Sequence, residues 1–338
     1  MKPLNVLVMT PAFDRAMPQA DEATLRRITL AGTGINITDA SALVHNELRG
    51  DMPGREKLDA LLAETEVIFG LILPPDITAR APKLKWVQMM SAGVDRLTQS
   101  DIWQSAVTIT GVSGITAAPI GEFVLGFMLM FVKRVPRWFE QKQKHQWQRF
   151  PTTVLYGKTA GIVGLGSIGQ EVARLCKAFG MRVVATRRST RREGRGRYVD
   201  RLLPADRLPE LLAESDFVVI CVPLTGETRR FIGEKEMRAM KPTAYLINIA
   251  RGGIVDEEAL VRALEEKRIA GAGLDVTTPE PLPPESRLWD LDNVILSPHI
   301  AGGMEDYMAR ATDVFCEDIR RYQAGRQLRN IIHRKRGY

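Results

Sequence analysis

Hydrophobic and polar positions along the chain follow two alternating patterns: short apolar runs, and stretches with apolar residues at helical spacing. In the first hundred residues, apolar runs typical of strands lie at 5–9, 67–73 and 86–89. Six more runs follow in the second half, at 161–163, 182–185, 217–221, 245–249, 271–275 and 294–296. Because helical patterns separate most of these runs, the sequence predicts an α/β fold with parallel, doubly wound sheets.

The six later runs match the strand count of a full dinucleotide-binding sheet. A helical pattern at 119–132 precedes them as a candidate crossover, and another at 307–324 follows them and would return to the first domain. We therefore expect a Rossmann dinucleotide-binding domain of residues 106–304, inserted in a smaller flavodoxin-like substrate domain of residues 1–105 and 305–338.

Residues 133–156 are rich in charged and aromatic side chains and fit neither pattern. Two interpretations remain open for this segment: a projecting arm that contacts a second subunit, or an ordinary capping segment.

Composition narrows the functional class. The chain has 338 residues, 45% hydrophobic and 26% charged, as in ordinary globular proteins of two domains. Its net charge of +7 could indicate a nucleic-acid partner, but residues 187–201 alone hold seven arginines against Glu193 and Asp200. Basic residues are not interleaved with aromatics that could stack bases. An anionic cofactor and substrate explain the charge more simply, so we expect no nucleic-acid partner.

The three cysteines, Cys176, Cys221 and Cys316, are far apart and lie in apolar patterns without metal-ligand spacing. We therefore expect buried free thiols, no metal and a reducing cytoplasm. The short apolar run near the N-terminus resembles a first strand more than a signal peptide. The longest apolar stretch, 123–132, is too short to span a bilayer, so no membrane association is expected.

The most informative motif is a glycine triplet at the junction of a predicted strand and a predicted helix, Gly164-x-Gly166-x-x-Gly169. In this context the first glycine permits a tight turn, the second lets backbone approach a pyrophosphate, and the third lets helix and strand pack closely. The N–H groups that begin the helix then face the phosphates. We predict a dinucleotide site at Gly164, Gly166, Ser167, Ile168 and Gly169.

The end of the next strand indicates which dinucleotide. An NAD enzyme usually places Asp or Glu there to hold the ribose 2′-hydroxyl, whereas this chain has Arg187 and Arg188. An arginine pair suits a 2′-phosphate through charge-assisted hydrogen bonds, which predicts NADP(H) rather than NAD(H). The alternative is a solvated basic loop, since further arginines follow at 191, 192, 195 and 197.

Three segments place polar side chains just after predicted strands, where ligands of open α/β sheets bind. They carry Arg251, then Asp275 and Glu280, then His299. This set suits carbonyl reduction: His299 can donate a proton, Arg251 can bind a carboxylate and polarise the carbonyl, and Glu280 would favour the imidazolium. Taken singly, a histidine after proline is more often structural and an arginine after a strand is often a surface ion pair. Of four histidines, only His299 follows a strand in this way.

The chain resembles the D-isomer-specific 2-hydroxyacid dehydrogenases over essentially its whole length. The resemblance rests on four segments in order, at 161–169, 248–256, 274–276 with 280–282, and 297–302. It implies that Arg251, Glu280 and His299 are catalytic and that Asp275 holds the nicotinamide carboxamide. It also implies cofactor contacts from Val222, Pro223, Ile249, Ala250 and Arg251.

In the first domain, the resemblance implies a loop whose backbone N–H groups grip the substrate carboxylate, at Ser91, Ala92, Gly93 and Val94. A glycine-containing turn can form such an anion-binding nest, although a plain β–α turn would look the same. Arg251 and His299 would complete the substrate site. NAD-using members carry Asp where this chain has Arg187, and the family's glyoxylate and hydroxypyruvate reductases commonly carry Arg.

These observations predict an NADP(H)-dependent reductase of a small 2-keto acid, such as glyoxylate or hydroxypyruvate, acting as a homodimer. A phosphoglycerate-type NAD dehydrogenase is an alternative, although no appended regulatory domain follows. A dinucleotide-sensing protein related to the family's transcriptional corepressors is another, because a retained Arg, Glu and His set does not exclude it. A formate dehydrogenase is disfavoured, since those relatives carry Gln where this chain has Glu280.

Overall fold

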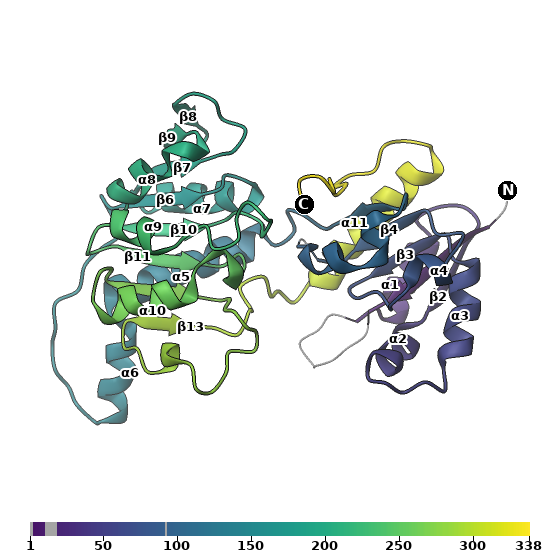
Figure 1. Ribbon diagram of the computed structural model, residues 1–338, viewed down its shortest axis with the longest axis horizontal. Coiled ribbons are helices and arrows are strands. Elements are labelled where there is room, and N and C mark those ends of the chain that lie inside the picture. Colours follow the sequence, from purple (N-terminus) through teal and green to yellow (C-terminus); the bar gives the residue numbers. More distant parts are fainter. Residues whose placement is uncertain (1–2, 11–18, 92) are drawn as a thin grey trace. The chain divides into compact units, whose positions relative to one another are not determined.

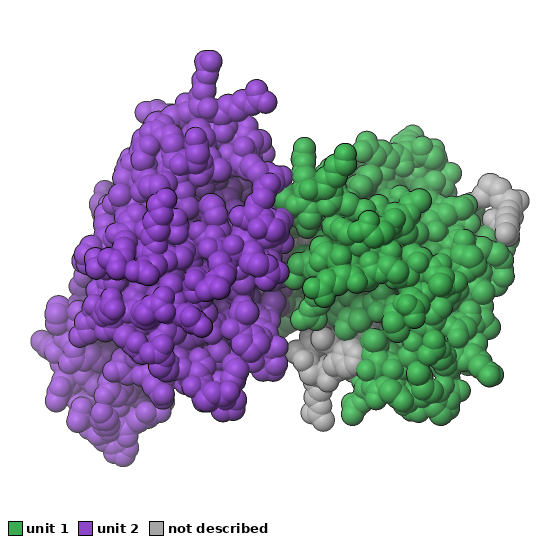
Figure 2. Space-filling view, in the orientation of Figure 1, with its two compact units in different colours: residues 1–115, 304–338 green, residues 116–303 purple. Residues whose placement is uncertain are grey.

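The structure, a computed structural model, describes residues 3–10, 19–91 and 93–338. The chain forms two compact units, one of Met1–Ile115 with Met304–Tyr338 and one of Thr116–Gly303 (Figure 2). Within the described residues, no helix is both long and apolar enough to cross a membrane. Each unit contains its own sheet with helices on both faces (Figure 1).

The first unit is built on a five-stranded parallel sheet of order β2-β1-β3-β4-β5, the strand order of flavodoxin-like folds. Side chains of β1 alternate between two cores, with Val6 and Val8 on one face and Leu7 and Met9 on the other. Burial on both faces explains why this strand is a nearly continuous apolar run in the sequence. The strands are β1 (Leu4–Met9), β2 (Ile35–Asp39), β3 (Val67–Gly70), β4 (Trp86–Met89) and β5 (Thr108–Thr110).

Helices cover both faces of this sheet. On one face lie α1 (Glu22–Thr29) and α11 (Tyr307–Gln323). On the other lie α2 (Ser41–Leu48), α3 (Arg55–Glu64) and α4 (Ile77–Arg80), and short 3-10 helices span Asp95–Gln99 and Asp101–Gln104. As the sequence predicts, the last long helix returns to the first unit: Phe315 of α11 stacks on Phe69 of β3, with ring centroids 4.5 Å apart.

The division between the units lies after Ile115, whereas the sequence predicts a domain boundary after residue 105. The reason is β5, whose residues Thr108–Thr110 pair in parallel with β4 and complete the first sheet. The sequence pattern does not predict this strand, because it is only three residues long. It does not predict β2 either, because the side chains of β2 are mostly exposed.

The second unit contains an eight-stranded sheet of order β13-β12-β11-β10-β6-β7-β9-β8. All neighbours are parallel except β8 and β9. Numbered along the chain, the parallel strands have the order 3-2-1-4-5-6 of a Rossmann sheet, extended by one strand. The strands are β6 (Thr159–Val163), β7 (Arg182–Thr186), β8 (Gly194–Gly196), β9 (Val199–Leu203), β10 (Phe217–Ile220), β11 (Tyr245–Asn248), β12 (Gly271–Leu274) and β13 (Val294–Leu296).

Two apolar cores sandwich this sheet. One is formed with α5 (Ala117–Lys133) and α7 (Ser167–Ala178), the other with α8 (Leu208–Glu214), α9 (Glu234–Ala239) and α10 (Glu257–Glu265). Short 3-10 helices span Ala205–Arg207, Gly252–Ile254 and Arg287–Trp289. The helix α6 (Val135–Gln143) has no buried residue and stands away from the sheet in Figure 1.

The arginine-rich segment after β7 is not a simple loop, because it forms the β8–β9 hairpin at the edge of the sheet. Arg201 of β9 forms ion pairs with Glu193, Glu210 and Glu214. Arg207 also pairs with Glu193 and Glu210. Part of the local excess of positive charge is therefore neutralised within the unit and is structural.

Candidate active site

The predicted cofactor and catalytic residues of the second unit all follow parallel strands, so they lie along one edge of its sheet. His299 follows β13, Glu280 and Asp275 follow β12, and Arg251 follows β11. Val222 and Pro223 follow β10, the glycine triplet follows β6, and Arg187 follows β7. Since these strands are neighbours in that order, the three candidate catalytic side chains come from adjacent strands.

The glycine triplet has the geometry that its spacing predicts. Gly164 has a φ of +98°, and a Cβ there would lie 2.7 Å from Val222 Cγ1. A Cβ on Gly169 would lie 2.3 Å from the Gly164 carbonyl oxygen, so α7 and the turn touch backbone to backbone. At Gly166, the residue before α7, a Cβ would meet none of the described atoms within 4 Å. Open space therefore faces the start of this helix, where N–H groups favour an anion.

The loop after β7 presents arginine side chains rather than a carboxylate. Arg187 is exposed, and among the described residues its guanidinium has no ion-pair partner. Arg188 is also exposed and forms an ion pair of 3.2 Å with Glu227 from the loop after β10. Arg187 is therefore the better placed of the two to take an additional anion.

The turn that carries Arg251 is fixed by an asparagine to which sequence analysis assigned no role. The Asn248 side chain donates to the Arg251 carbonyl at 2.9 Å and accepts from the Ala250 N–H at 3.1 Å. The Arg251 Nη1 donates to the Ala250 carbonyl at 2.7 Å. Ile249 of the same turn is buried in the adjoining core.

Glu280 and His299 form the pair that the sequence predicts. The Glu280 Oε2 lies 2.9 Å from His299 Nδ1, and its Oε1 accepts the Thr277 N–H at 3.2 Å. Burial alone would raise the pKa of Glu280, but the hydrogen bond and charge of His299, the Thr277 N–H and the charge of Arg251 together lower it. Glu280 is therefore ionised at neutral pH, and its carboxylate faces the imidazole ring.

Asp275 performs a structural task that sequence analysis missed. Its carboxylate is buried and accepts hydrogen bonds from Ser297 Oγ at 2.7 Å and from the N–H groups of Ile300 and Ala301 at 2.8 and 2.9 Å. Its carbonyl accepts the His299 N–H at 2.8 Å. His299 itself has a φ of +55°, a left-handed conformation in which non-glycine residues are uncommon. The Asp275 carboxylate thus anchors the loop that carries His299 through three hydrogen bonds.

The predicted carboxylate-binding loop belongs to the first unit, where Ala92 lies outside the described residues. Ser91 Oγ donates to the Gly93 carbonyl at 2.8 Å, and the hydroxyl of Tyr307 donates to the Met90 carbonyl. Val94 is buried and precedes the first 3-10 helix. Because Arg251 and His299 belong to the second unit, the grouping of this loop with them stays a prediction.

The described residues contain no cluster of three or more His, Cys, Asp or Glu side chains suited to a metal ion.

Residues 125–301 match the family model of the D-isomer-specific 2-hydroxyacid dehydrogenase NAD-binding domain. A glyoxylate reductase from Korarchaeum cryptofilum is 33% identical over 294 residues, which are 84% of this chain and 87% of the relative.

Two solved structures have a similar fold over nearly all of both chains. A D-isomer-specific 2-hydroxyacid dehydrogenase from Xanthobacter autotrophicus, in complex with NADPH and MES, has a TM-score of 0.82 at 28% identity and covers 100% of each chain. An NADPH-dependent glyoxylate/hydroxypyruvate reductase from Sinorhizobium meliloti, in complex with NADP and sulfate, has a TM-score of 0.82 at 26% identity. It covers 99% of this chain and 100% of that one. On the family match, the sequence similarity and the shared fold, this chain belongs to the D-isomer-specific 2-hydroxyacid dehydrogenases, which are NAD(P)-dependent enzymes.

Proposed function

We propose that this enzyme reduces a small 2-keto acid, with glyoxylate and hydroxypyruvate as leading substrates, to the D-2-hydroxy acid with NADPH. The observation that carries the proposal is the 2.9 Å contact between Glu280, which follows β12, and His299, which follows β13; β12 neighbours β11, which leads into the Arg251 turn. A proton donor and an anion-binding side chain would then lie on neighbouring strands at one sheet edge, as carbonyl reduction requires. The relatives named above include a glyoxylate reductase, an NADPH-dependent glyoxylate/hydroxypyruvate reductase and a structure in complex with NADPH, which supports the same activity.

The residues along the edge fit a dinucleotide. The open space beside Gly166 and the N–H groups that begin α7 suit a pyrophosphate, and Arg187 after the neighbouring strand β7 suits a 2′-phosphate. On the other side of β6, the neighbouring strands are β10, β11 and β12, and Asp275 follows β12. Val222, Pro223, Ile249 and Ala250 would then line the cofactor between the two ends.

The chemistry needs a hydride on the carbonyl carbon and a proton on the carbonyl oxygen. Bound NADPH supplies the hydride, and the chain's own residues manage charge and the proton. His299 donates the proton to the developing alkoxide, and Glu280 stabilises the imidazolium until that transfer. Arg251 binds the substrate carboxylate and polarises the carbonyl, which lowers the barrier electrostatically.

The decisive experiment is a NADPH-oxidation screen over a panel of 2-keto acids, repeated with NADH. We expect turnover with glyoxylate or hydroxypyruvate and a higher kcat/KM with NADPH than with NADH. Tight dinucleotide binding without turnover of any keto acid would instead support a dinucleotide-sensing protein. Turnover confined to a phosphorylated hydroxy acid with NAD would support the phosphoglycerate-type alternative.

We further propose that the segment after α5 contacts a second copy of this chain. Its aromatic side chains are exposed to an unusual degree, with Trp147 97%, Tyr156 78% and Phe139 59% exposed. Large apolar side chains that gather on one exposed segment usually mark an interface. Light scattering should give a dimer for the wild type, and Trp147→Glu should shift the mass toward the monomer. A wild-type monomer at all concentrations would exclude this role.

The cytoplasm is the compartment that we propose, on the basis of the cysteines. Cys176, Cys221 and Cys316 are free, and burial raises the pKa of Cys176 to about 12. Free cysteines without disulfides are usual in a reducing compartment.

A further inference from the structure

The loop that carries Glu280 has few backbone donors with which to anchor itself. Residues 277–284 read Thr-Thr-Pro-Glu-Pro-Leu-Pro-Pro, and proline has no backbone N–H. Half of the N–H groups of this segment are therefore missing. The Thr277 N–H is used within the loop, where it donates to Glu280 Oε1 at 3.2 Å. The loop needs an acceptor from another element if its position is to be fixed.

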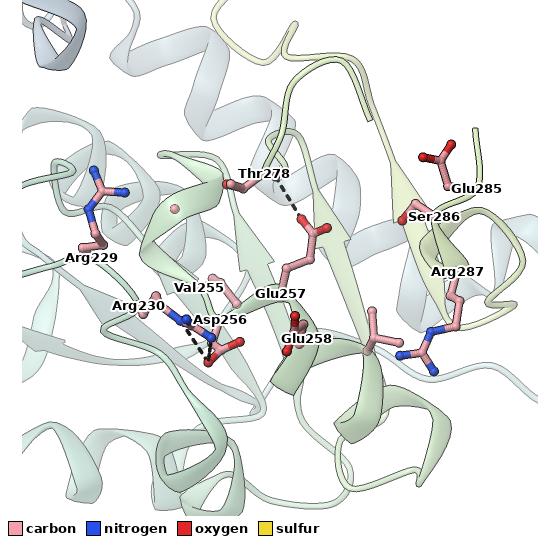
Figure 3. A pocket seen from close by; sticks show the side chains of 12 residues that line it. Arg229, Arg230, Val255, Asp256, Glu257, Glu258, Thr278, Glu285, Ser286 and Arg287 are labelled. Carbon is pink, nitrogen blue, oxygen red and sulfur yellow. Dashed lines mark hydrogen bonds and ion pairs between the residues drawn. The ribbon is translucent and has the colours of Figure 1, made fainter. Parts of the chain in front are cut away.

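Glu257 supplies that acceptor. Its Oε2 accepts the Thr278 N–H at 2.9 Å, as the dashed line from Glu257 to Thr278 in Figure 3 shows. Within the described part of the chain, no other side chain from outside the loop accepts an N–H of residues 277–284. Glu257 is the first residue of α10, and the preceding Asp256 caps this helix by accepting the Ala259 N–H. The acceptor is therefore held by a rigid element.

The same loop rests on the Arg251 turn. A Cβ on Gly252 would lie 2.0 Å from the Thr277 carbonyl oxygen and 2.5 Å from Thr278 Oγ1, so the two backbones are in direct contact. Thr278 is thus packed against Gly252 on one side and hydrogen-bonded to Glu257 on the other. Two residues further along the chain, Glu280 reaches His299 at 2.9 Å.

We propose that Glu257 is a positioning residue for the catalytic pair, acting through the Thr278 peptide to keep the Glu280 carboxylate against His299 Nδ1. Glu257 touches neither reacting atoms nor His299, so its effect passes through the loop alone. The inference deepens the proposed function and rests on it only for the measurements of rate.

The surroundings of Glu257 provide a matched control. Its side chain lines a pocket of about 510 Å³ that Figure 3 shows from close by. Arg230 in this pocket pairs with Asp256 at 2.6 Å, and Arg287 pairs with Glu265 at 2.8 Å. Glu258 carries the same charge on the same helical turn and lines the same pocket, but it is exposed. The charged residues that line the pocket are Arg229, Arg230, Asp256, Glu257, Glu258, Glu285 and Arg287.

Burial raises the pKa of Glu257, and the Thr278 N–H opposes that shift. The test therefore separates loss of the hydrogen bond from loss of charge by comparing Glu257→Ala, Glu257→Gln and Glu258→Ala. Glu257→Ala should lower kcat with a keto acid by roughly 10-fold to 100-fold, the scale that a displacement of about 1 Å causes. The Kd for NADPH should stay unchanged. Glu257→Gln keeps an acceptor oxygen and should retain most of the rate, and Glu258→Ala should match the wild type.

The pH profile gives a readout that general destabilisation would not move. Because Glu257→Ala lets Glu280 drift from His299, the alkaline limb of kcat/KM should move to lower pH, in the same direction as for Glu280→Gln. In a Glu280→Gln background, Glu257→Ala should cost little more, since both changes remove the same contact. Fully additive losses, an unmoved alkaline limb or an equal loss in Glu258→Ala would each overturn the proposal.

A spectroscopic measurement decides the matter without turnover. In the cofactor-free protein, the ¹³C–¹H signal of the His299 ring should shift in Glu257→Ala and stay in place in Glu258→Ala. Should Glu257→Ala fail to fold, Glu257→Met, which has a similar length and no acceptor oxygen, takes its place. A wild type without reductase activity would defeat the proposed function. An unmoved His299 signal would defeat the positioning role independently.

Discussion

The two ends of the sheet edge in the second unit are built by different means. At the β6–β7 end, glycines without side chains allow close contacts between backbone segments. The Arg187 side chain at this end is exposed to solvent. At the β11–β13 end, it depends on side chains that hold backbone, with Asn248 fixing the Arg251 turn and Asp275 fixing the His299 loop. The first end exposes backbone N–H groups and a cation, whereas the second fixes the loop that carries His299, the proposed proton donor.

This difference has a consequence for mutational tolerance. A site made from backbone N–H groups and solvated cations should lose binding and keep its fold when a residue that faces the ligand is altered. A site made from a hydrogen-bonded network should lose rate, because a reacting group that is displaced by even a small distance works poorly. The following substitutions test that contrast.

The largest effect is expected at His299. His299→Gln should lower turnover by roughly 10²-fold to 10⁴-fold, the usual contribution of a general acid, while the Kd for NADPH hardly changes. Stopped-flow reduction of one keto acid and a fluorescence titration of the cofactor measure the two quantities. Near-wild-type turnover would mean that another group donates the proton. His299→Asn serves as a control for the left-handed backbone, which asparagine adopts readily.

The next comparison places the same substitution at two glycines of one motif. Gly169→Ala puts a Cβ 2.3 Å from the Gly164 carbonyl oxygen and should lower the free energy of unfolding by about 1–3 kcal/mol. Gly166→Ala enters open space with an ordinary φ of −87°, so stability should hold while NADPH binding weakens. Denaturant unfolding gives the free energy of unfolding of each variant, and cofactor titration gives its Kd for NADPH. Equal destabilisation by the two substitutions would contradict this division of roles.

A smaller effect, specific to one cofactor, is expected at Arg187. Hydrogen bonds between charged groups contribute about 1.5–3 kcal/mol each, and 1.4 kcal/mol is about tenfold in affinity. Arg187→Asp should therefore weaken NADPH by roughly 10-fold to 100-fold and leave NADH nearly unaffected. Arg195→Asp on the β8–β9 hairpin is the matched control for net charge. Equal weakening of both cofactors, or a wild type that prefers NADH, would defeat the claim.

The smallest expected effect is a shift in pH dependence. Glu280 is ionised at neutral pH because its pKa is lowered in the fold, and its carboxylate lies 2.9 Å from His299 Nδ1. Glu280→Gln keeps the shape and removes the negative charge that would favour a protonated proton donor. The alkaline limb of kcat/KM for reduction should then move to lower pH. A limb that stays in place or moves upward would make Glu280 a local structural contact only.

The same contrast explains which features could be predicted from the sequence. The glycine triplet was recognisable because its spacing reflects steric demands of a single turn, and Arg251, Glu280 and His299 were recognisable because each follows a strand. Asn248 and the anchoring role of Asp275 were missed, because their partners are backbone groups that the sequence does not identify. Glu257 was missed for the same reason: its partner is a backbone N–H 21 residues away along the chain.

The fold could be predicted where burial is continuous and not where strands are short or charged. β1, β6 and β10 are buried on both faces and stand out as apolar runs. β5 has three residues, and β9 carries Asp200 and Arg201 in the middle of its five, so their pattern resembles a polar loop. Backbone pairing defines them as strands, that of β5 with β4 and that of β9 with β7 and β8.

The β8–β9 hairpin also bears on the solubility of this enzyme. An outermost strand presents unpaired backbone groups, and proteins avoid pairing with other chains by making such strands short, charged or twisted. β8 has three residues, Gly194, Arg195 and Gly196, and its pairing with β9 is interrupted by a register irregularity. β13, at the opposite border, is also only three residues long. Both borders of this large parallel sheet therefore resist strand addition, and removal of residues 192–198 would leave β9 as a longer border that favours aggregation.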